Sequence, residues 1–147
     1  MKIHVVVIAL GLLAGACQSK SDSHSEHNHA VAESSAGPVA DLEQQVMAVH
    51  DSVMPKISDI LRLKKEVTAK VEKTTDPAAK EMGVSINSRL TEADKAMMDW
   101  MHQYNGDTLG KLDQTKAVEY LKDQQRKVND VRDQMQKSIA DAQKYLQ

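Results

Sequence analysis

The chain of 147 residues has a single cysteine, a single tryptophan and no phenylalanine. One cysteine excludes an intramolecular disulfide and any CxxC metal site. Acidic and basic residues alternate without a block of like charges, which excludes the basic footprint of a nucleic-acid-binding protein. There is no Gly-rich phosphate loop, GxSxG motif or HExxH motif, and no carboxylate pair stands in apolar surroundings. We therefore expect no enzymatic activity and no catalytic residue.

What the chain does contain favours helices. Charged residues make up 27% of it, aromatic residues only 3%, and the formal net charge is −2. Ala, Lys, Gln, Leu, Met and Val are abundant, and most of these residues have good helix propensity. The length suits one folded domain.

The first 16 residues have the layout of a secretory signal peptide. Lys2 gives a short positive start, and the apolar run VVVIALGLLAGA is far shorter than the roughly 20 residues of a membrane-spanning helix. The run ends at Cys17, which resembles a bacterial lipoprotein signal, although Ala14 stands where such signals usually have Leu. The resemblance implies that Cys17 is lipidated and becomes the mature N-terminus. The alternative is ordinary secretion after the Ala-x-Ala pattern "AGA", with a free thiol.

Residues 17–38 are expected to form a disordered tether, because this Ser- and His-rich segment has no apolar periodicity. It carries His24, His27 and His29, and short histidine-rich tracts bind Zn²⁺ or Cu²⁺. The alternative is a polar linker that merely contains histidine.

From residue 39 to residue 147 the apolar residues recur with helical spacing, in three stripes. Pro55 interrupts the first stripe, and since the pattern stays in register we expect a kink there, a true break at Met54 being the alternative. Asp76 is a suitable N-cap for the second helix, with Pro77 in its first position. Gly83 weakens that helix, and Thr91 with Asp94 could cap a later one. The stripes are Leu42, Val46, Val49, Val53, Ile57, Ile60, Leu63 or Lys64, Val67 and Val71; Met82, Ile86, Leu90, Ala93, Met97, Trp100 and Tyr104; and Val118, Leu121, Val128, Val131, Met135, Ile139, Ala142 and Leu146.

Helices with one apolar stripe cannot stand alone in water, and short connections make neighbouring helices antiparallel. The sequence therefore predicts an all-α fold: an elongated, coiled-coil-like, antiparallel three-helix bundle that follows the signal peptide and the tether. A homo-oligomer through the long third helix is a further option.

Methionine and histidine concentrate at two places in the bundle. His50 and Met54 lie near each other on the first helix, and Met98 and His102 are four residues apart on the second. Thioethers and imidazoles suit copper, especially Cu(I). The competing interpretation is that the methionines fill core gaps, that Trp100 anchors the core with its N–H near the surface, and that the histidines lie on helix flanks.

The segments VHDSVMPKISDI, ADKAMMDWMHQY and YLKDQQRKV resemble a group of small bacterial lipoproteins that often carry the automatic label "viral A-type inclusion protein". The resemblance covers nearly all of residues 42–146. It implies a lipoprotein with a helical architecture and supplies no catalytic residue.

The first functional hypothesis is a structural or interaction module, lipid-anchored in the envelope, facing the periplasm and placed in the outer membrane. It would bind another envelope protein through a helix face. The second is a lipoprotein that handles copper or zinc through the tether histidines together with His50, Met54, Met98 and His102. A third is haem ligation by a Met/His pair. The first hypothesis needs no cofactor.

Overall fold

A computed structural model describes residues 37–147, and these residues form four α-helices, a short 3₁₀ helix and no strand. The all-α prediction is confirmed. The elements are α1 (Pro38–Val53), α2 (Lys56–Lys73), α3 (Pro77–Gln103), η1 (Gly106–Lys111) and α4 (Gln114–Leu146). At 1.5 Å per residue, α4 is about 50 Å long and runs the length of the bundle.

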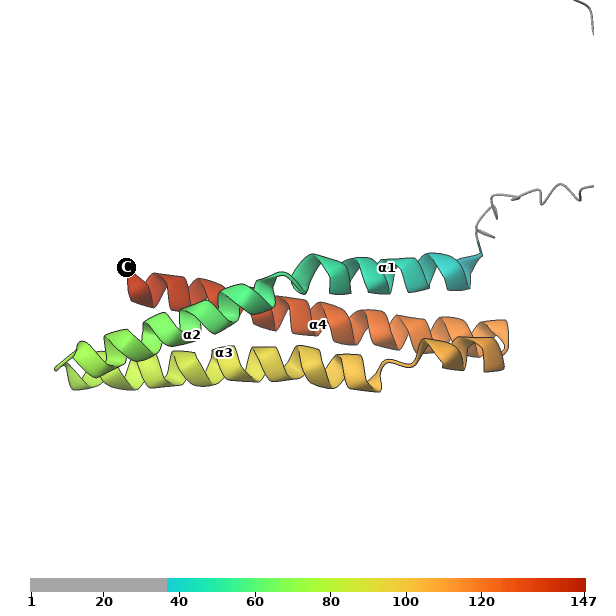
Figure 1. Cartoon of the computed structure of the whole chain (residues 1–147). Helices are drawn as coiled ribbons and strands as arrows, with labels where there is room; N and C mark the ends of the chain where they lie inside the picture. Colours follow the sequence, from blue (N-terminus) through green and yellow to red (C-terminus); the bar gives the residue numbers. More distant parts are fainter. Residues whose placement is uncertain (1–36) are drawn as a thin grey trace, which may run out of the picture. The chain divides into compact units, whose positions relative to one another are not determined.

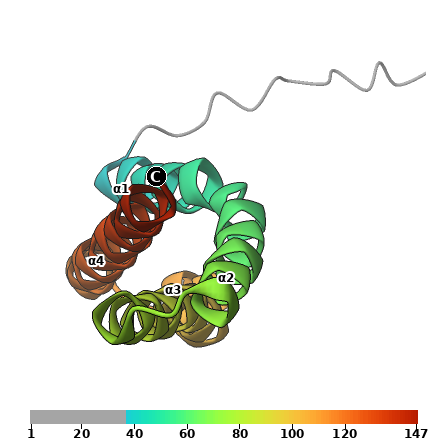
Figure 2. The same ribbon diagram turned by 90° about the vertical axis from the view of Figure 1, so that its left-hand side faces the viewer.

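The helices run up, down and up, with α1 and α2 together forming the first rod (Figure 1). α2 packs on both α3 and α4, whereas α1 packs chiefly on α4. Figure 2 looks along the bundle and shows how α2 swings away from the line of α1 towards α3. The antiparallel helical bundle is thus confirmed, and its first rod is bent.

The bend lies at Met54 and Pro55. Both residues keep right-handed helical dihedral angles, with φ and ψ of −53° and −42° at Met54 and −60° and −23° at Pro55. Pro55 has no N–H to donate to the Asp51 carbonyl group, and the next bond, from Ile57 N to Met54 O, spans only three residues. The helix is thus interrupted at Met54 and Pro55, which agrees with the alternative of a break at Met54, while the helical dihedral angles of both residues keep the two segments in one bent rod.

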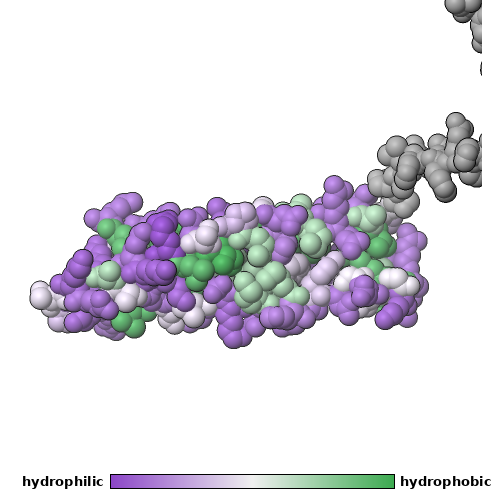
Figure 3. Space-filling view, in the orientation of Figure 1, coloured by the Kyte–Doolittle hydropathy of each residue, from purple (hydrophilic) through white to green (hydrophobic). Residues whose placement is uncertain are grey.

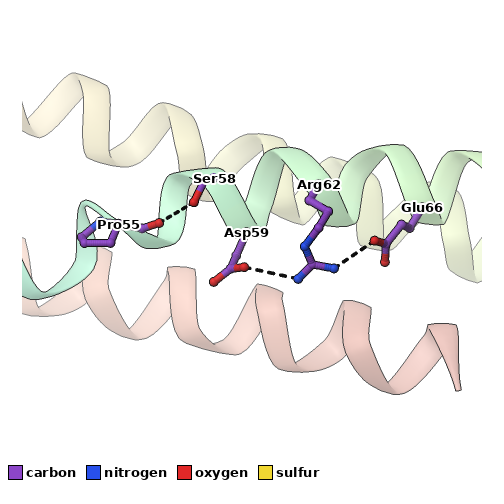
Figure 4. Close-up of polar contacts among 5 residues, drawn as sticks. All are labelled: Pro55, Ser58, Asp59, Arg62 and Glu66. Carbon is purple, nitrogen blue, oxygen red and sulfur yellow. Dashed lines mark hydrogen bonds and ion pairs between the residues drawn. The ribbon is translucent and has the colours of Figure 1, made fainter.

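Polar side chains accompany the start of α2. The Ser58 hydroxyl donates to the Pro55 carbonyl oxygen at 2.7 Å. Arg62 then donates to Asp59 and to Glu66, and Figure 4 shows the three side chains in a row along α2. The hydrogen bonds that Arg62 donates to Glu66 and to Asp59 raise the pKa of Arg62. These exposed ion pairs give α2 a solvated outer face.

The N-terminus of α3 follows the prediction. The Asp76 carboxylate accepts from the N–H groups of Ala78 and Ala79, and Pro77 occupies the first helical position. Gly83 does not end or delay the helix, which continues unbroken to Gln103 without a second cap at Thr91.

Gly83 is required by packing. A Cβ atom at this position would lie 2.2 Å from Val71 Cγ2 and 2.6 Å from the Tyr145 hydroxyl oxygen. The missing side chain lets α2, α3 and α4 approach one another here, and the Tyr145 hydroxyl donates to the Ala79 carbonyl oxygen at 2.9 Å. The glycine that weakens the helix locally thus tightens the bundle.

The core follows the predicted stripes with few exceptions. The fully buried large side chains are Val46, Val53, Ile60, Leu63, Val67, Leu90, Met97, Leu121, Val128 and Met135. Met82 was predicted in the stripe of α3, but its side chain is 56% exposed. Two polar residues, Gln124 and Ser138, are buried on α4, and the Ser138 hydroxyl donates to the Met135 carbonyl oxygen.

The surface is largely hydrophilic. On the face in Figure 3, apolar patches appear near the middle of the bundle and near the beginning of α1. Among residues 37–147, no helix combines the length and the apolar character needed to cross a bilayer.

Candidate functional site

The predicted site residues fall into two groups. Cys17, His24, His27 and His29 lie outside the described residues, as do the signal peptide and almost all of the tether. Of the others, His102 is exposed, whereas His50, Met54 and Met98 are partly buried.

His50 lies at the contact between α1 and α3. Its Nε2 atom is 3.3 Å from the Sδ atom of Met101, and its Nδ1 atom is 2.9 Å from a carboxylate oxygen of Asp51. The imidazole ring also lies against Trp100, with 5.7 Å between ring centroids. The partner of His50 on α3 is thus Met101, and not Met98 or His102.

An aromatic stack continues from this point towards the end of α3. Trp100 and Tyr104 stack with centroids 5.3 Å apart, and Tyr120 of α4 follows at 6.3 Å from Tyr104. Burial, then the charge of Glu43, raises the pKa of Tyr104 to about 12. The Tyr120 hydroxyl accepts a hydrogen bond from the Asn105 N–H group at 2.8 Å. This bond links α4 to the segment that follows α3.

Trp100 differs from its prediction in one respect. Its side chain is a core anchor, only 5% exposed, but its Nε1–H is buried and has no protein hydrogen-bond partner among the described residues. The rings of His50 and Tyr104 lie against the indole, and the predicted position of its N–H near the surface is wrong.

A second site lies at the opposite end of the bundle, where α3 begins and α4 ends. It is a groove of about 650 Å³, here named the α3–α4 groove. Its apolar lining comes from Ala78, Ala79, Met82, Ile86 and Tyr145. Met82 is exposed because its side chain lines the groove and is not part of the core.

Charged side chains surround the α3–α4 groove: Lys70, Arg89, Lys137 and Lys144, with Asp76 and Asp141. Asp141 accepts from both Arg89 and Lys137, and Asp76 caps α3, so both carboxylates are already engaged. Lys70 donates to the Tyr145 carbonyl oxygen at 2.6 Å and stands over the Tyr145 ring, whereas Lys144 has no ion-pair partner within residues 37–147. The groove therefore has an excess of positive charge.

Neither Met101 nor the groove was among the predicted site residues. The one signal for Met101 is its place in the methionine-rich segment that also contains Met98. The groove could not have been found from periodicity alone, since its lining joins side chains of residues 70–89 with side chains of residues 137–145. Within residues 37–147, no three His, Cys, Asp or Glu side chains gather as a metal site.

Comparison with known proteins gives no relative: no family model matches the chain, and neither a curated protein nor a solved structure matches it.

Proposed function

We propose that this protein is a lipid-anchored envelope lipoprotein whose helical bundle binds a partner protein in the α3–α4 groove. The partner element is an amphipathic helix with acidic residues along its flanks. Cys17 carries the lipid, and the tether gives the bundle its reach from the membrane surface.

The exposed position of Met82 in the α3–α4 groove is the observation that supports this proposal. Its side chain is 56% exposed in a groove lined by other apolar groups. Methionine is flexible and polarisable, which suits it to receive an apolar side chain from a partner. A groove between two packed helices is also the shape that accepts the apolar face of a third helix.

Charge complementarity determines the kind of helix. Four basic side chains surround the groove, and the two carboxylates among them are occupied by contacts within the protein. An acidic helix would pair with Lys144 and Lys70, whereas a basic helix would be repelled. Complementary charge of this kind mainly sets partner choice and the rate of association.

Site-specific photo-crosslinking in the native cells tests the groove. We expect Met82→p-benzoylphenylalanine to crosslink to one acidic, amphipathic segment of another protein, identified by mass spectrometry of the joined peptides. Lys144→Glu in the same chain should weaken that crosslink several-fold.

Val84→p-benzoylphenylalanine is the matched control, since Val84 is similarly exposed on α3 but does not line the groove. The same product at both positions would contradict the proposal. So would a crosslink to phospholipid, to a second copy of this chain, or to a basic segment.

The anchor has its own test. Mass spectrometry of the mature N-terminus should find acyl groups on Cys17. An unmodified thiol would remove the membrane anchor from the proposal and leave the groove untouched.

A further inference from the structure

We infer that His50 and Met101 form a binding site for one soft monovalent metal ion, Cu(I) or Ag(I), beside Trp100. This site is separate from the α3–α4 groove, and it does not depend on the function proposed for that groove. It differs from the set that the sequence suggested, because Met101 replaces Met98 and His102 as the contribution of α3.

The hydrogen bonding of His50 is the first support. The Asp51 carboxylate only accepts hydrogen bonds, so the Nδ1 atom of His50, 2.9 Å away, carries a proton. In the neutral imidazole the Nε2 atom then has a free lone pair, and this lone pair faces the Met101 sulfur at 3.3 Å. Two electron-pair donors face each other, and a cation between them would satisfy both.

This arrangement is also the one that histidine ligands of metals adopt. A metal-bound imidazole typically donates its other ring N–H to a carboxylate or a carbonyl group, which fixes the tautomer and the ring orientation. Asp51 occupies that position for His50. The carboxylate thus directs Nε2, and not Nδ1, towards Met101.

The spacing of the two donor atoms fits one shared ion. In proteins, zinc–nitrogen and zinc–thiolate bonds measure about 2.0 Å and about 2.3 Å, and these lengths serve here as a guide to the reach of a bound ion. A nitrogen-to-sulfur separation of 3.3 Å lets a single ion reach both atoms at an angle somewhat above a right angle.

The donor types and surroundings select the metal. Thioether and imidazole donors favour Cu(I), and Ag(I) shares its charge and softness. The His50 side chain is 18% exposed, which leaves an entry path, and the adjacent Trp100 ring offers a π face to a cation. Met54 lies one helical turn beyond His50 and is packed against the core.

Trp100 is the only tryptophan in the chain, so its fluorescence reports on this site alone. We would titrate the full chain with Ag(I) in chloride-free buffer, with Cys17→Ser in every variant because a free thiolate would bind silver first. Every variant also carries His24→Gln, His27→Gln and His29→Gln, so that the tether histidines do not compete for silver. The expected result is a change in Trp100 fluorescence that saturates at one ion per chain.

Two variants should abolish that response or raise its midpoint at least about tenfold, a loss of about 1.4 kcal/mol. Met101→Leu removes the sulfur and keeps the side-chain volume, and His50→Gln removes the imidazole. Met82→Leu and His102→Gln are the controls, since both residues are exposed on α3. The thermal midpoint without metal verifies that each variant is folded.

The inference is overturned if Ag(I) causes no saturable change in the parent chain. It is equally overturned if folded Met101→Leu and His50→Gln chains respond like the parent, or if the control variants lose the response to the same extent.

Discussion

The two halves of the bundle are built differently on either side of Pro55. In the α2 half three helices meet, and Gly83 lets them pack closely around Val71 and Tyr145. In the α1 half, α1 packs mainly on α4, and aromatic rings from the end of α3 occupy part of the remaining space. α1 buries only Val46 and Val53 completely, whereas α2 buries three side chains over a similar length.

The difference shows that the same apolar spacing can give two kinds of helix packing. Apolar residues recur once per turn in both halves, so both halves form helices. The close-packed half provides a rigid frame for the α3–α4 groove. The looser half leaves room for a partly buried histidine and a methionine, whose donor atoms remain within reach of an ion.

The largest expected effect compares two leucines. Leu63 on α2 is 1% exposed, and Leu63→Ala should lower the free energy of unfolding by about 2–5 kcal/mol, because it leaves a cavity among three helices. Leu42 on α1 is only partly buried, and Leu42→Ala should cost less than half as much. Urea unfolding measures both. Equal losses would mean that the two halves are packed alike.

Next comes the close approach at Gly83. Gly83→Ala should destabilise the protein by about 1–3 kcal/mol, because the added methyl group meets Val71 and Tyr145. The change is informative because alanine alone would favour the helix. Gly110→Ala in η1 is the control, since a Cβ there meets no atom within 4 Å. If Gly83→Ala were stabilising, the tight packing of the α2 half would be refuted.

A smaller effect is expected at the helix caps. Asp76→Ala should cost about 1 kcal/mol, because the N–H groups of Ala78 and Ala79 lose their acceptor. Asp113 accepts from one backbone group, the N–H of Lys116, and forms an exposed ion pair with the Lys116 ammonium group. Because an exposed pair contributes little, Asp113→Ala should cost less. Thermal unfolding of the two variants gives the order, and the reverse order would contradict the capping geometry.

The smallest effect is a change in the free energy of unfolding that appears only at high pH. Burial, with the charge of Glu43, raises the pKa of Tyr104 to about 12, above its ordinary value of 10.0. Between about pH 10 and pH 12 the folded state therefore keeps this proton, whereas the unfolded state has lost it. The contribution of Tyr104 to the free energy of unfolding is thus complete below about pH 10 and disappears as the pH rises towards 12. Tyr104→Phe should remove this part of the alkaline loss of stability. Absorbance titration of tyrosinate should show one group fewer titrating late, and an unchanged late phase would contradict the assignment.

Much of the fold could be predicted because helices are local. The apolar spacing, Asp76 with Pro77, and the register across Pro55 each act within a few residues of the chain. Gly83 was interpreted as a weak point for the same reason. Its role depends on Val71 and Tyr145, which the fold brings to it from two other helices.

The candidate sites show the same limit. The sequence shows a methionine-rich segment that contains Met101, but the contact between Met101 on α3 and His50 on α1 exists only in the folded bundle. Met82 lies at a position of the apolar stripe, and only the end of α4 shows that it lines a groove. Residue types could be read from the sequence, whereas their neighbours across helices could not.

Amide hydrogen exchange of the full chain tests the difference between the two halves most directly, since exchange measures the free energy of local opening. The amides of α2 should be protected nearly as well as those of the middle of α4, and those of α1 should exchange faster through opening at Pro55. Equal protection on both sides of Pro55 would contradict this account of the bundle.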